Sequence, residues 1–147
     1  ETLDMSSFYG PVRFGVFASD DERIGRMARV INERLRVGGA SDGFVRYEHD
    51  KYYQQRDADS PNPWVITTLW LARYYIDQST SLKELQQALE ILEWTASHAT
   101  ISGVLAEQMH PDTRAQLSTA PLVWSHAEFV LAIHAYLERA AELGGER

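Results

Sequence analysis

The chain has 147 residues, of which 44% are apolar and 24% are charged, and this is enough for one domain with a substantial core. With 14 basic and 21 acidic residues its net charge is −7, and no Lys/Arg cluster occurs, which argues against nucleic acid as the main partner. Cysteine is absent, so disulfides and thiolate metal sites are excluded. No apolar run reaches the roughly 18–20 residues of a membrane span, and no signal peptide is visible.

The first 40 residues predict two helices. Residues 2–9 have the pattern of a helix tail, which Gly10-Pro11 ends. Ser19-Asp-Asp-Glu22 is a capping box with Ser19 as N-cap, and it opens an amphipathic helix that ends at Gly38-Gly39. The apolar face of this second helix holds, at helical spacing, Ile24, Met27, Ala28, Ile31 and Leu35.

Three further helices are predicted after residue 60. Asn62 as N-cap and Pro63 at the first helical position open an apolar helix to Ile76, which should be buried on most sides. Capping boxes at Ser81 and Ser125 open an amphipathic helix and a second, mostly apolar helix. Amphipathic and apolar helices thus alternate, which is typical of αα-hairpins stacked in two layers, as in a solenoid or a closed α/α barrel. The predicted fold class is all-α.

Two long connections, at about 37–61 and 99–121, each lead from an outer helix to an inner one. Long irregular connections in a compact domain are usually functional or disordered. If consecutive helices are antiparallel, both connections lie at the same end of the layers. We therefore expect that one site draws on both.

The first connection alternates aromatic and charged residues over residues 46–53 and is followed by Asn62-Pro63-Trp64. Sugars are bound by this mixture, because flat rings cover their C–H faces and fixed charges bind their hydroxyls. A solvated loop pinned by its tyrosines explains the composition equally well. In the second connection Glu107 follows three apolar residues, where a carboxylate that water can reach is able to act as a general base. Pattern alone favours a structural role for Glu107, as a helix cap or as the partner of an arginine.

The five histidines show no metal-ligand spacing, and His126 and His134, eight residues apart, are interpreted as core or site-lining residues. Phosphate-binding Gly-rich loops, nucleophile elbows and HExxH patterns are absent. No metal or organic cofactor is implied.

At the two connections the sequence resembles glycoside hydrolase family 15, the glucoamylase-type enzymes, over about residues 3–138. The blocks that carry the resemblance, in the family's order, are Leu3-Asp4-Met5-Ser6, Phe14-Gly-Val-Phe17 with Asp20-Asp21, Gly43 to Tyr53, Asn62 to Trp70, Gly103 to Gln108, and Pro121 to Glu128.

This resemblance implies that residues 1–147 form the C-terminal part of an (α/α)6 barrel. It implies inverting hydrolysis of α-linked glucosides from the non-reducing end, with release of glucose. The family's general base is the Glu of a Glu-Gln motif, here Glu107. Arg46 matches an arginine that holds sugar hydroxyls, and Tyr52 and Trp64 match aromatic positions that line the same subsites. His126 lies in a matching block without an assigned role.

A neighbouring arginine favours the ionised form of a carboxylate, so we expect Arg46 to lie beside Glu107. The sequence departs from the family pattern in the charged stretch 54–61, which replaces a short Gly-containing one and leaves substrate length and linkage open. Met109-His110 also stands where an aromatic residue is common.

The resemblance places the general acid upstream of Glu1, together with several inner helices of the barrel. We therefore expect the 147 residues alone to be inactive. We also expect their uncovered apolar helix flanks to favour self-association or pairing with the N-terminal half. The acidic balance and the absence of cysteine favour a cytoplasmic microbial enzyme, with a secreted one as the alternative.

Other readings stay open at this point. Within the enzyme class the substrate is a maltooligosaccharide or α-glucan, with trehalose or an α-1,6-glucan as alternatives, although the Tyr-Tyr and Asn-Pro-Trp blocks favour the glucoamylase branch. From other classes, a non-catalytic regulatory or carbohydrate-binding module explains the fold but not the retention of Glu107 and Arg46. A purely structural helical array explains the helices but not the polar-aromatic blocks.

Overall fold

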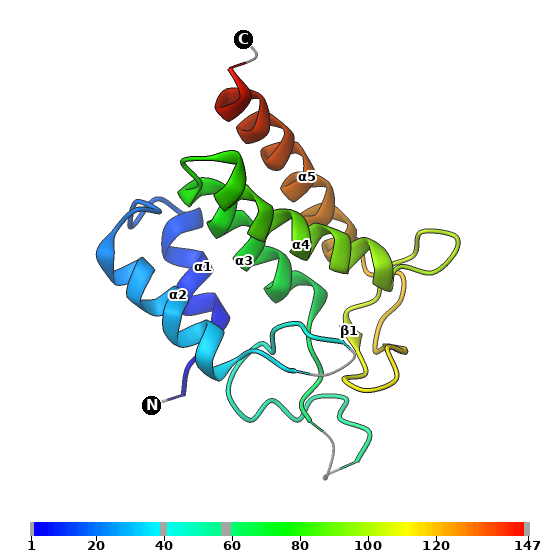
Figure 1. Ribbon diagram of the computed structural model, residues 1–147. Helices are drawn as coiled ribbons and strands as arrows, with labels where there is room; N and C mark the ends of the chain where they lie inside the picture. The colour runs from blue at the N-terminus through cyan, green and yellow to red at the C-terminus, as the bar shows by residue number, and fades with distance from the viewer. Residues whose placement is uncertain (1, 39–40, 57–59, 146–147) are drawn as a thin grey trace.

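The computed structural model describes residues 2–38, 41–56 and 60–145 of the chain (Figure 1). Within these residues the regular structure consists of five helices and one small antiparallel sheet. In chain order the elements are α1 (Met5–Arg13), α2 (Glu22–Arg34), α3 (Val65–Gln78), α4 (Leu82–His98), β1 (Gln108–Met109), β2 (Gln116–Leu117) and α5 (Val123–Gly144). The all-α prediction is confirmed. The sheet, in which Gln108 pairs with Leu117, is an unpredicted feature of the second connection.

Helix α3 forms the inner layer of the molecule, as its apolar sequence predicts. Nine of its 14 residues are buried, and it packs against both α4 and α5. Helix α2 buries only the stripe Ile24, Ala28 and Ile31, so it is an outer helix, and α4 likewise buries one side. The alternation of outer and inner helices read from the sequence is thus found for α2, α3 and α4.

Helix α1 begins, rather than ends, in the first ten residues. The Asp4 carboxylate accepts a hydrogen bond from the Ser6 N–H at 2.7 Å, and the helix then runs to Arg13. The predicted stop at Gly10-Pro11 is wrong. Pro11 lies inside the helix, where it removes one intrahelical hydrogen bond, and the helix ends two residues later.

Only one of the three predicted capping boxes has its serine at the N-cap. The Ser81 hydroxyl accepts from the Glu84 N–H at 3.3 Å, although the Glu84 carboxylate accepts from Thr80 rather than from Ser81 itself. Helix α2 is capped by Asp21 and not by Ser19. Hydrogen bonds from the side chain and backbone of Arg23 lower the pKa of Asp21 to about 2, so this cap is ionised at neutral pH. Of the predicted Gly38-Gly39 end, Gly39 lies outside the described residues, and α2 ends earlier, at Arg34.

Asn62 and Ser125 make tertiary contacts instead of capping helices. The Asn62 side-chain amide donates to the Gln108 Oε1 at 2.8 Å, and α3 begins three residues later. The Ser125 hydroxyl donates to the Ala106 carbonyl at 2.8 Å, and α5 begins two residues before Ser125. Both predicted caps are wrong: each side chain donates to a distant acceptor, whereas an N-cap side chain accepts from the backbone N–H groups of the first turn.

Both long connections lie at one end of the helix layers, beside the start of α3 (Figure 1). The Ser41 N–H donates to the Pro111 carbonyl at 2.9 Å, and the Met109 N–H donates to the Pro63 carbonyl at 3.0 Å. The prediction that the two connections meet is confirmed. Gly43 is needed for this packing, because a Cβ there would lie 2.8 Å from both the Pro63 Cβ and the Trp94 Cζ2.

Helix α5 exposes one apolar side, which we call the α5 flank. Its members, with their exposed fractions, are Val123 (80%), Trp124 (50%), Val130 (53%), Leu131 (44%) and Leu137 (58%). Large apolar side chains that lie together in water mark an interaction surface more often than a free one.

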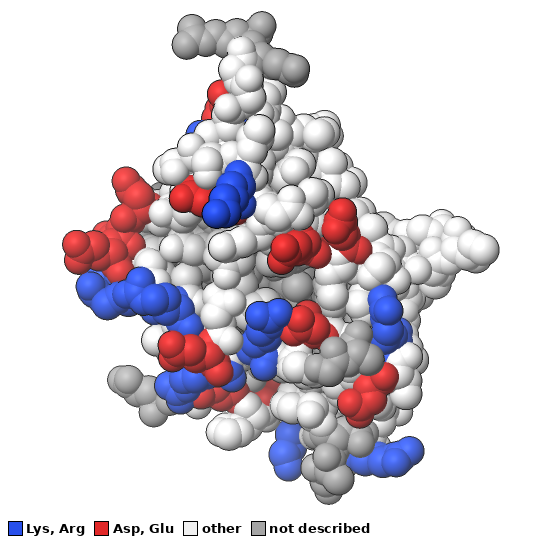
Figure 2. Space-filling model, viewed as in Figure 1, with Lys and Arg blue, Asp and Glu red and all other residues white. Residues whose placement is uncertain are grey.

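On the face seen in Figure 2, acidic and basic side chains are interspersed. Salt bridges between surface neighbours include the one that joins Arg36 with Asp42 at 2.7 Å. Among the described helices none combines the length and the apolar character that crossing a membrane requires.

Candidate active site

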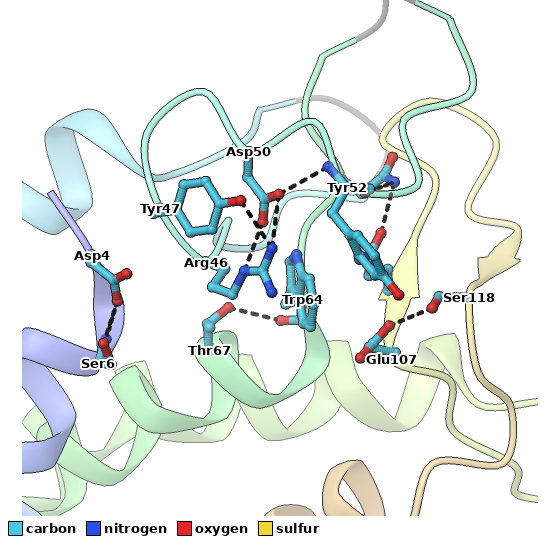
Figure 3. A network of polar contacts seen from close by, with 12 residues as sticks. Asp4, Ser6, Arg46, Tyr47, Asp50, Tyr52, Trp64, Thr67, Glu107 and Ser118 are labelled. Carbon is cyan, nitrogen blue, oxygen red and sulfur yellow. Dashed lines mark hydrogen bonds and ion pairs between the residues drawn. The ribbon is translucent and has the colours of Figure 1, made fainter. Parts of the chain in front are cut away.

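A cavity of about 660 Å³ opens where the two connections meet the starts of α1, α3 and α5. This is within the usual range of roughly 300–1,000 Å³ for small-molecule sites. Its walls are made by Asp4, Ser6, Arg46, Tyr47, Tyr52, Trp64, Ile66, Thr67, Trp70, Glu107 and Trp124. All four residues that the sequence singled out therefore line this one cavity (Figure 3): Arg46, Tyr52, Trp64 and Glu107.

Arg46 is fixed by its own neighbourhood. Its Nε and Nη2 donate to the two Asp50 carboxylate oxygens, each at 3.2 Å. Its guanidinium carbon lies 4.3 Å from the centre of the Trp64 ring and 4.6 Å from that of Tyr47. Burial lowers the pKa of Arg46, but the Asp50 carboxylate outweighs it and the net shift is upward, so the cation persists at any working pH.

Asp50 organises the first connection from within the protein. Only 2% of it is exposed, and besides Arg46 it accepts from the Tyr52 N–H at 3.0 Å. Figure 3 shows Asp50 above Arg46, with Trp64 beside the guanidinium. One buried carboxylate thus sets the orientation of the arginine and the path of the chain at Tyr52.

Residues at the start of the chain form hydrogen bonds with the same connection. The Met5 N–H donates to the Arg46 carbonyl at 2.9 Å, and the Leu3 N–H donates to a Glu48 carboxylate oxygen at 2.9 Å. Glu48 also forms an ion pair with Arg34 on α2. The hydrogen bond from Leu3 is the main cause that lowers the pKa of Glu48.

Glu107 is held differently and does not pair with Arg46. Its Oε2 accepts a hydrogen bond from the Ser118 hydroxyl. Its N–H donates to the Thr119 carbonyl at 2.9 Å, and its carbonyl accepts from the Val65 N–H at 3.1 Å. Arg46 and Glu107 line the same cavity, but the carboxylate that Arg46 pairs with is Asp50, which both of its donating nitrogens face.

Two carboxylates line the described cavity wall, Asp4 and Glu107. Asp4 is engaged as the cap of α1, since one of its oxygens accepts from both the Ser6 N–H and the Ser6 hydroxyl, at 2.7 and 2.5 Å. Glu107 uses one oxygen for Ser118. Each carboxylate therefore keeps one oxygen that these contacts do not use, but Asp4 also has a structural role at the start of α1.

The aromatic wall has donors that the protein leaves unused. The indole N–H groups of Trp64 and Trp70 are buried, and neither has a hydrogen-bond partner among the described residues. Such groups are rare in folded proteins and are expected where a ligand, water or further protein supplies the acceptor. Trp70 also stacks on Tyr9, with ring centres 4.5 Å apart.

His126 does not line the cavity. Its Nε2 accepts a hydrogen bond from the Leu105 N–H at 3.1 Å, two residues before Glu107. Across the described part of the chain, no three His, Asp or Glu residues are grouped as a metal site would require.

Comparisons with known proteins bear on the family of the chain. The model of the family described as glycosyl hydrolases family 15 matches residues 79–134. An uncharacterized glycosyl hydrolase of Methanocaldococcus jannaschii is 31% identical over 145 residues, covering 91% of this chain and 22% of that protein. The resemblance to glycoside hydrolase family 15 is confirmed.

Two further relatives of this family 15-like chain carry enzyme names. A glucoamylase of a Clostridium species is 28% identical over 140 residues, covering 90% of this chain and 19% of that protein. Trehalase 2 of Sulfolobus acidocaldarius is 32% identical over 104 residues, covering 70% of this chain and 16% of that protein. The family 15-like chain thus spans about a fifth of the length of the curated relatives it matches.

Solved structures give the same fold. A wild-type glycosidase, 25% identical, superposes with a TM-score of 0.66 and covers 98% of this chain and 36% of that one. A glycosidase variant in complex with glucose has a TM-score of 0.72 at 22% identity, which shows a shared fold. The fold is consistent with part of an (α/α)6 barrel.

Sequence reasoning on the family 15-like chain missed several residues around the cavity. Trp70 and Trp124 lie in apolar helical runs, which predict core positions as readily as a binding wall. Asp50 stands in a matching block but received no role, and Ser118 carried no signal at all. Part of the departing stretch 54–61, residues 57–59, lies outside the described residues.

Proposed function

We propose that this chain is the C-terminal part of the catalytic barrel of an inverting glycosidase that releases glucose from the non-reducing ends of α-glucans. The observation that carries the proposal is that Glu107 lines the same cavity as Arg46 and the rings of Tyr52 and Trp64. The likeness to a glucoamylase supports α-linked glucosides as the substrate class.

In the proposed reaction Glu107 is the general base. It takes a proton from a water molecule as the water oxygen forms a bond to the anomeric carbon, while the bond from that carbon to the leaving oxygen breaks. A second carboxyl group protonates the leaving oxygen. Ser118 binds the Oε2 of Glu107, so Oε1 is the oxygen that faces the attacking water.

Arg46 orients the sugar in this account. Its contacts among the described residues use Nε and Nη2, so Nη1 is left to donate to a sugar hydroxyl. The buried Asp50 holds the guanidinium in place before the substrate arrives, which reduces the entropy lost on binding. Tyr52 and Trp64 supply ring faces for the C–H surfaces of the sugar.

The general acid in this proposal comes from outside the 147 residues. Inverting chemistry needs two carboxyl groups roughly 6.5–9.5 Å apart, and in this proposal Asp4, the other carboxylate on the described wall, keeps its role as the cap of α1. The proposal therefore includes that the 147 residues alone release no glucose.

The same proposal assigns the α5 flank to contact with the remainder of the barrel, or with a second copy when that remainder is missing. The change of Val130 and Leu137 to Ser in the 147-residue chain should weaken its self-association about tenfold or more. Each substitution removes exposed apolar surface that association would bury. Sedimentation velocity measures this. Leu82→Ser is the matched control, since Leu82 is similarly exposed (55%) but lies on the outer helix α4. Equal sedimentation of all three proteins would contradict the assignment.

Trehalose is the second candidate substrate, and the likeness to a trehalase favours it. The full-length protein should be assayed with maltotetraose and with trehalose. Glucose released mainly from trehalose would move the assignment to that substrate, and release from neither would support a non-catalytic module.

The stereochemistry of the product tests the inverting step. Proton NMR in the first minutes of maltotetraose hydrolysis by the full-length protein should show β-glucose ahead of mutarotation. First-formed α-glucose would overturn the proposed role of Glu107 as base, because retention requires a nucleophile instead.

A further inference from the structure

The segment Leu105–Glu107 is an irregular stretch whose backbone is held at nearly every polar group. Leu105 and Ala106 are buried, with 1% and 0% of their surface exposed. The Leu105 carbonyl accepts from the Leu122 N–H at 3.0 Å. At the other end, the Glu107 N–H and carbonyl bond to Thr119 and Val65. The position of the Glu107 side chain is therefore set by what holds this backbone.

Two further polar groups of this backbone are bound by side chains, and both side chains lie in the first turn of α5. The His126 Nε2 accepts from the Leu105 N–H at 3.1 Å. The Ser125 hydroxyl donates to the Ala106 carbonyl at 2.8 Å and is itself fully buried. Neither residue lines the cavity, so neither contacts a bound sugar.

We propose that His126, assisted by Ser125, positions the general base by fixing the backbone of residues 105–106. This inference rests on the proposed function of Glu107. It assigns a purpose to a histidine whose place in the sequence gave none.

The argument depends on the cost of a buried amide without an acceptor. If His126 is lost, the Leu105 N–H has no partner in a dry environment, and the segment shifts to find one. A displacement of about 1 Å at a catalytic group reduces the rate by about 10². Glu107 follows Leu105 by two residues, so a shift of this segment reaches the base directly.

The hydrogen bond also defines which replacements are tolerated. A nitrogen that accepts carries no proton, so His126 is neutral here with its proton on Nδ1. Glutamine places an amide oxygen at about the reach of Nε2 and can accept in its place. Phenylalanine fills the same space without an acceptor.

The test compares His126→Gln with His126→Phe in the full-length protein. In His126→Phe, kcat for maltotetraose should fall about 10- to 100-fold while KM changes less than about threefold, because Arg46, Tyr52 and Trp64 are undisturbed. His126→Gln should retain kcat within about fivefold. Equal losses in both variants, or wild-type kcat in His126→Phe, would overturn the proposal.

Ser125→Ala provides a milder variant if His126→Phe does not fold. It removes one hydroxyl and should lower kcat about three- to tenfold with KM unchanged. Wild-type kcat in Ser125→Ala would remove Ser125 from the positioning role.

Amide hydrogen exchange separates this inference from the proposed function. In the wild-type protein the Leu105 amide should be protected, with protection kept in His126→Gln and lost in His126→Phe or, if that variant does not fold, in His126→Leu. Unchanged exchange in the acceptor-free variant would overturn the positioning role even if the protein acts on a different substrate. Lack of glucose release by the wild-type protein, with the expected exchange pattern, would instead overturn the proposed function alone.

Discussion

The two connections that form the cavity are built in opposite ways. In the first, Arg46 is held by a partner four residues away and by rings at Tyr47 and Trp64. In the second, Glu107 is held by contacts with α3 and with the Ser118–Thr119 segment, and its neighbour Leu105 is held by α5. The arginine is thus positioned mostly by local side chains, whereas the carboxylate is positioned by the packing of distant elements.

This difference predicts which substitutions act locally and which act through the fold. A change in the first connection should affect substrate binding and leave the second connection intact. A change in α5 or around Ser118 should affect the rate constant more than binding. The predictions below either separate the two regions further or show that they act as one.

Arg46→Leu should give the largest effect within the first connection. It removes the cation that we propose orients the sugar, and it leaves Asp50, which is 2% exposed, as a buried carboxylate without its ion-pair partner. We expect kcat/KM for maltotetraose in the full-length protein to fall about 10²- to 10³-fold. Arg36→Leu is the control, since its salt bridge with Asp42 lies on the outer surface. Equal activities of the two variants would remove Arg46 from the site.

Asn62→Leu tests the bridge between the connections. Asn62 and Gln108 are both buried, and the 2.8 Å hydrogen bond between them joins the two connections. Loss of one partner leaves the other unsatisfied and should destabilise the protein by about 1–3 kcal/mol, measured by thermal or urea unfolding.

A double-mutant cycle provides the control for this bridge. The double change of Asn62 and Gln108 to Leu should cost less than the sum of the single changes, because the side chain that each single change leaves without its partner is then also absent. Strict additivity would show that the two connections are not coupled here.

Ser118→Ala should have a smaller effect, confined to the second connection. The Glu107 carboxylate loses one donor but keeps its backbone contacts, so kcat should fall about two- to tenfold with KM unchanged. Steady-state kinetics on maltotetraose measures this. Ser102→Ala, at an exposed turn of the same connection, should match the wild type. A KM effect as large as the kcat effect would indicate that Ser118 contacts the substrate instead.

The smallest expected effect is a loosening of the second connection in acid. Burial, assisted by the nearby Arg114 guanidinium, lowers the pKa of His98, and its neutral Nε2 accepts from the Arg114 Nε at 3.3 Å. Because the folded pKa lies below the unfolded value of about 6.5, this stabilisation is complete above that pH. It is lost as the pH falls through the folded pKa.

Hydrogen exchange of residues 110–117 should therefore accelerate as the pH is lowered below about 6.5, after correction for the intrinsic rate. Residues 44–50 should show no such change. His98→Gln should abolish the difference between the two segments. A parallel response of both segments would mean that the acid effect is global.

Much of the fold follows from the sequence, because the spacing of apolar residues along α2 and α3 matches the residues that these helices bury. The apolar run of α3 and the one-sided pattern of α2 predict inner and outer helices, and the lengths of the connections predict where they meet. Helix starts were predicted less well. Asn62 and Ser125 have the right residue type for caps, but their partners are 46 and 19 residues away, and local spacing carries no information on such partners.

The site residues also divide into those that the sequence indicates and those that only the packing reveals. The likeness to known motifs selected Arg46, Tyr52, Trp64 and Glu107, which all line the cavity. Asp50 was available in principle, since an acidic residue four positions from Arg46 is a natural partner. The contacts of Ser118 and His126 with the Glu107 segment depend on how α5 and the second connection pack, and this is fixed only in three dimensions.

The central claim is that Glu107 is the general base of this cavity, and Glu107→Gln in the full-length protein tests it most directly. The substitution keeps the size of the side chain and removes its ability to accept a proton from water. The account predicts that kcat for maltotetraose falls about 10²- to 10⁴-fold, while Glu93→Gln, an exposed carboxylate on α4, matches the wild type. Wild-type kcat in Glu107→Gln would contradict the account.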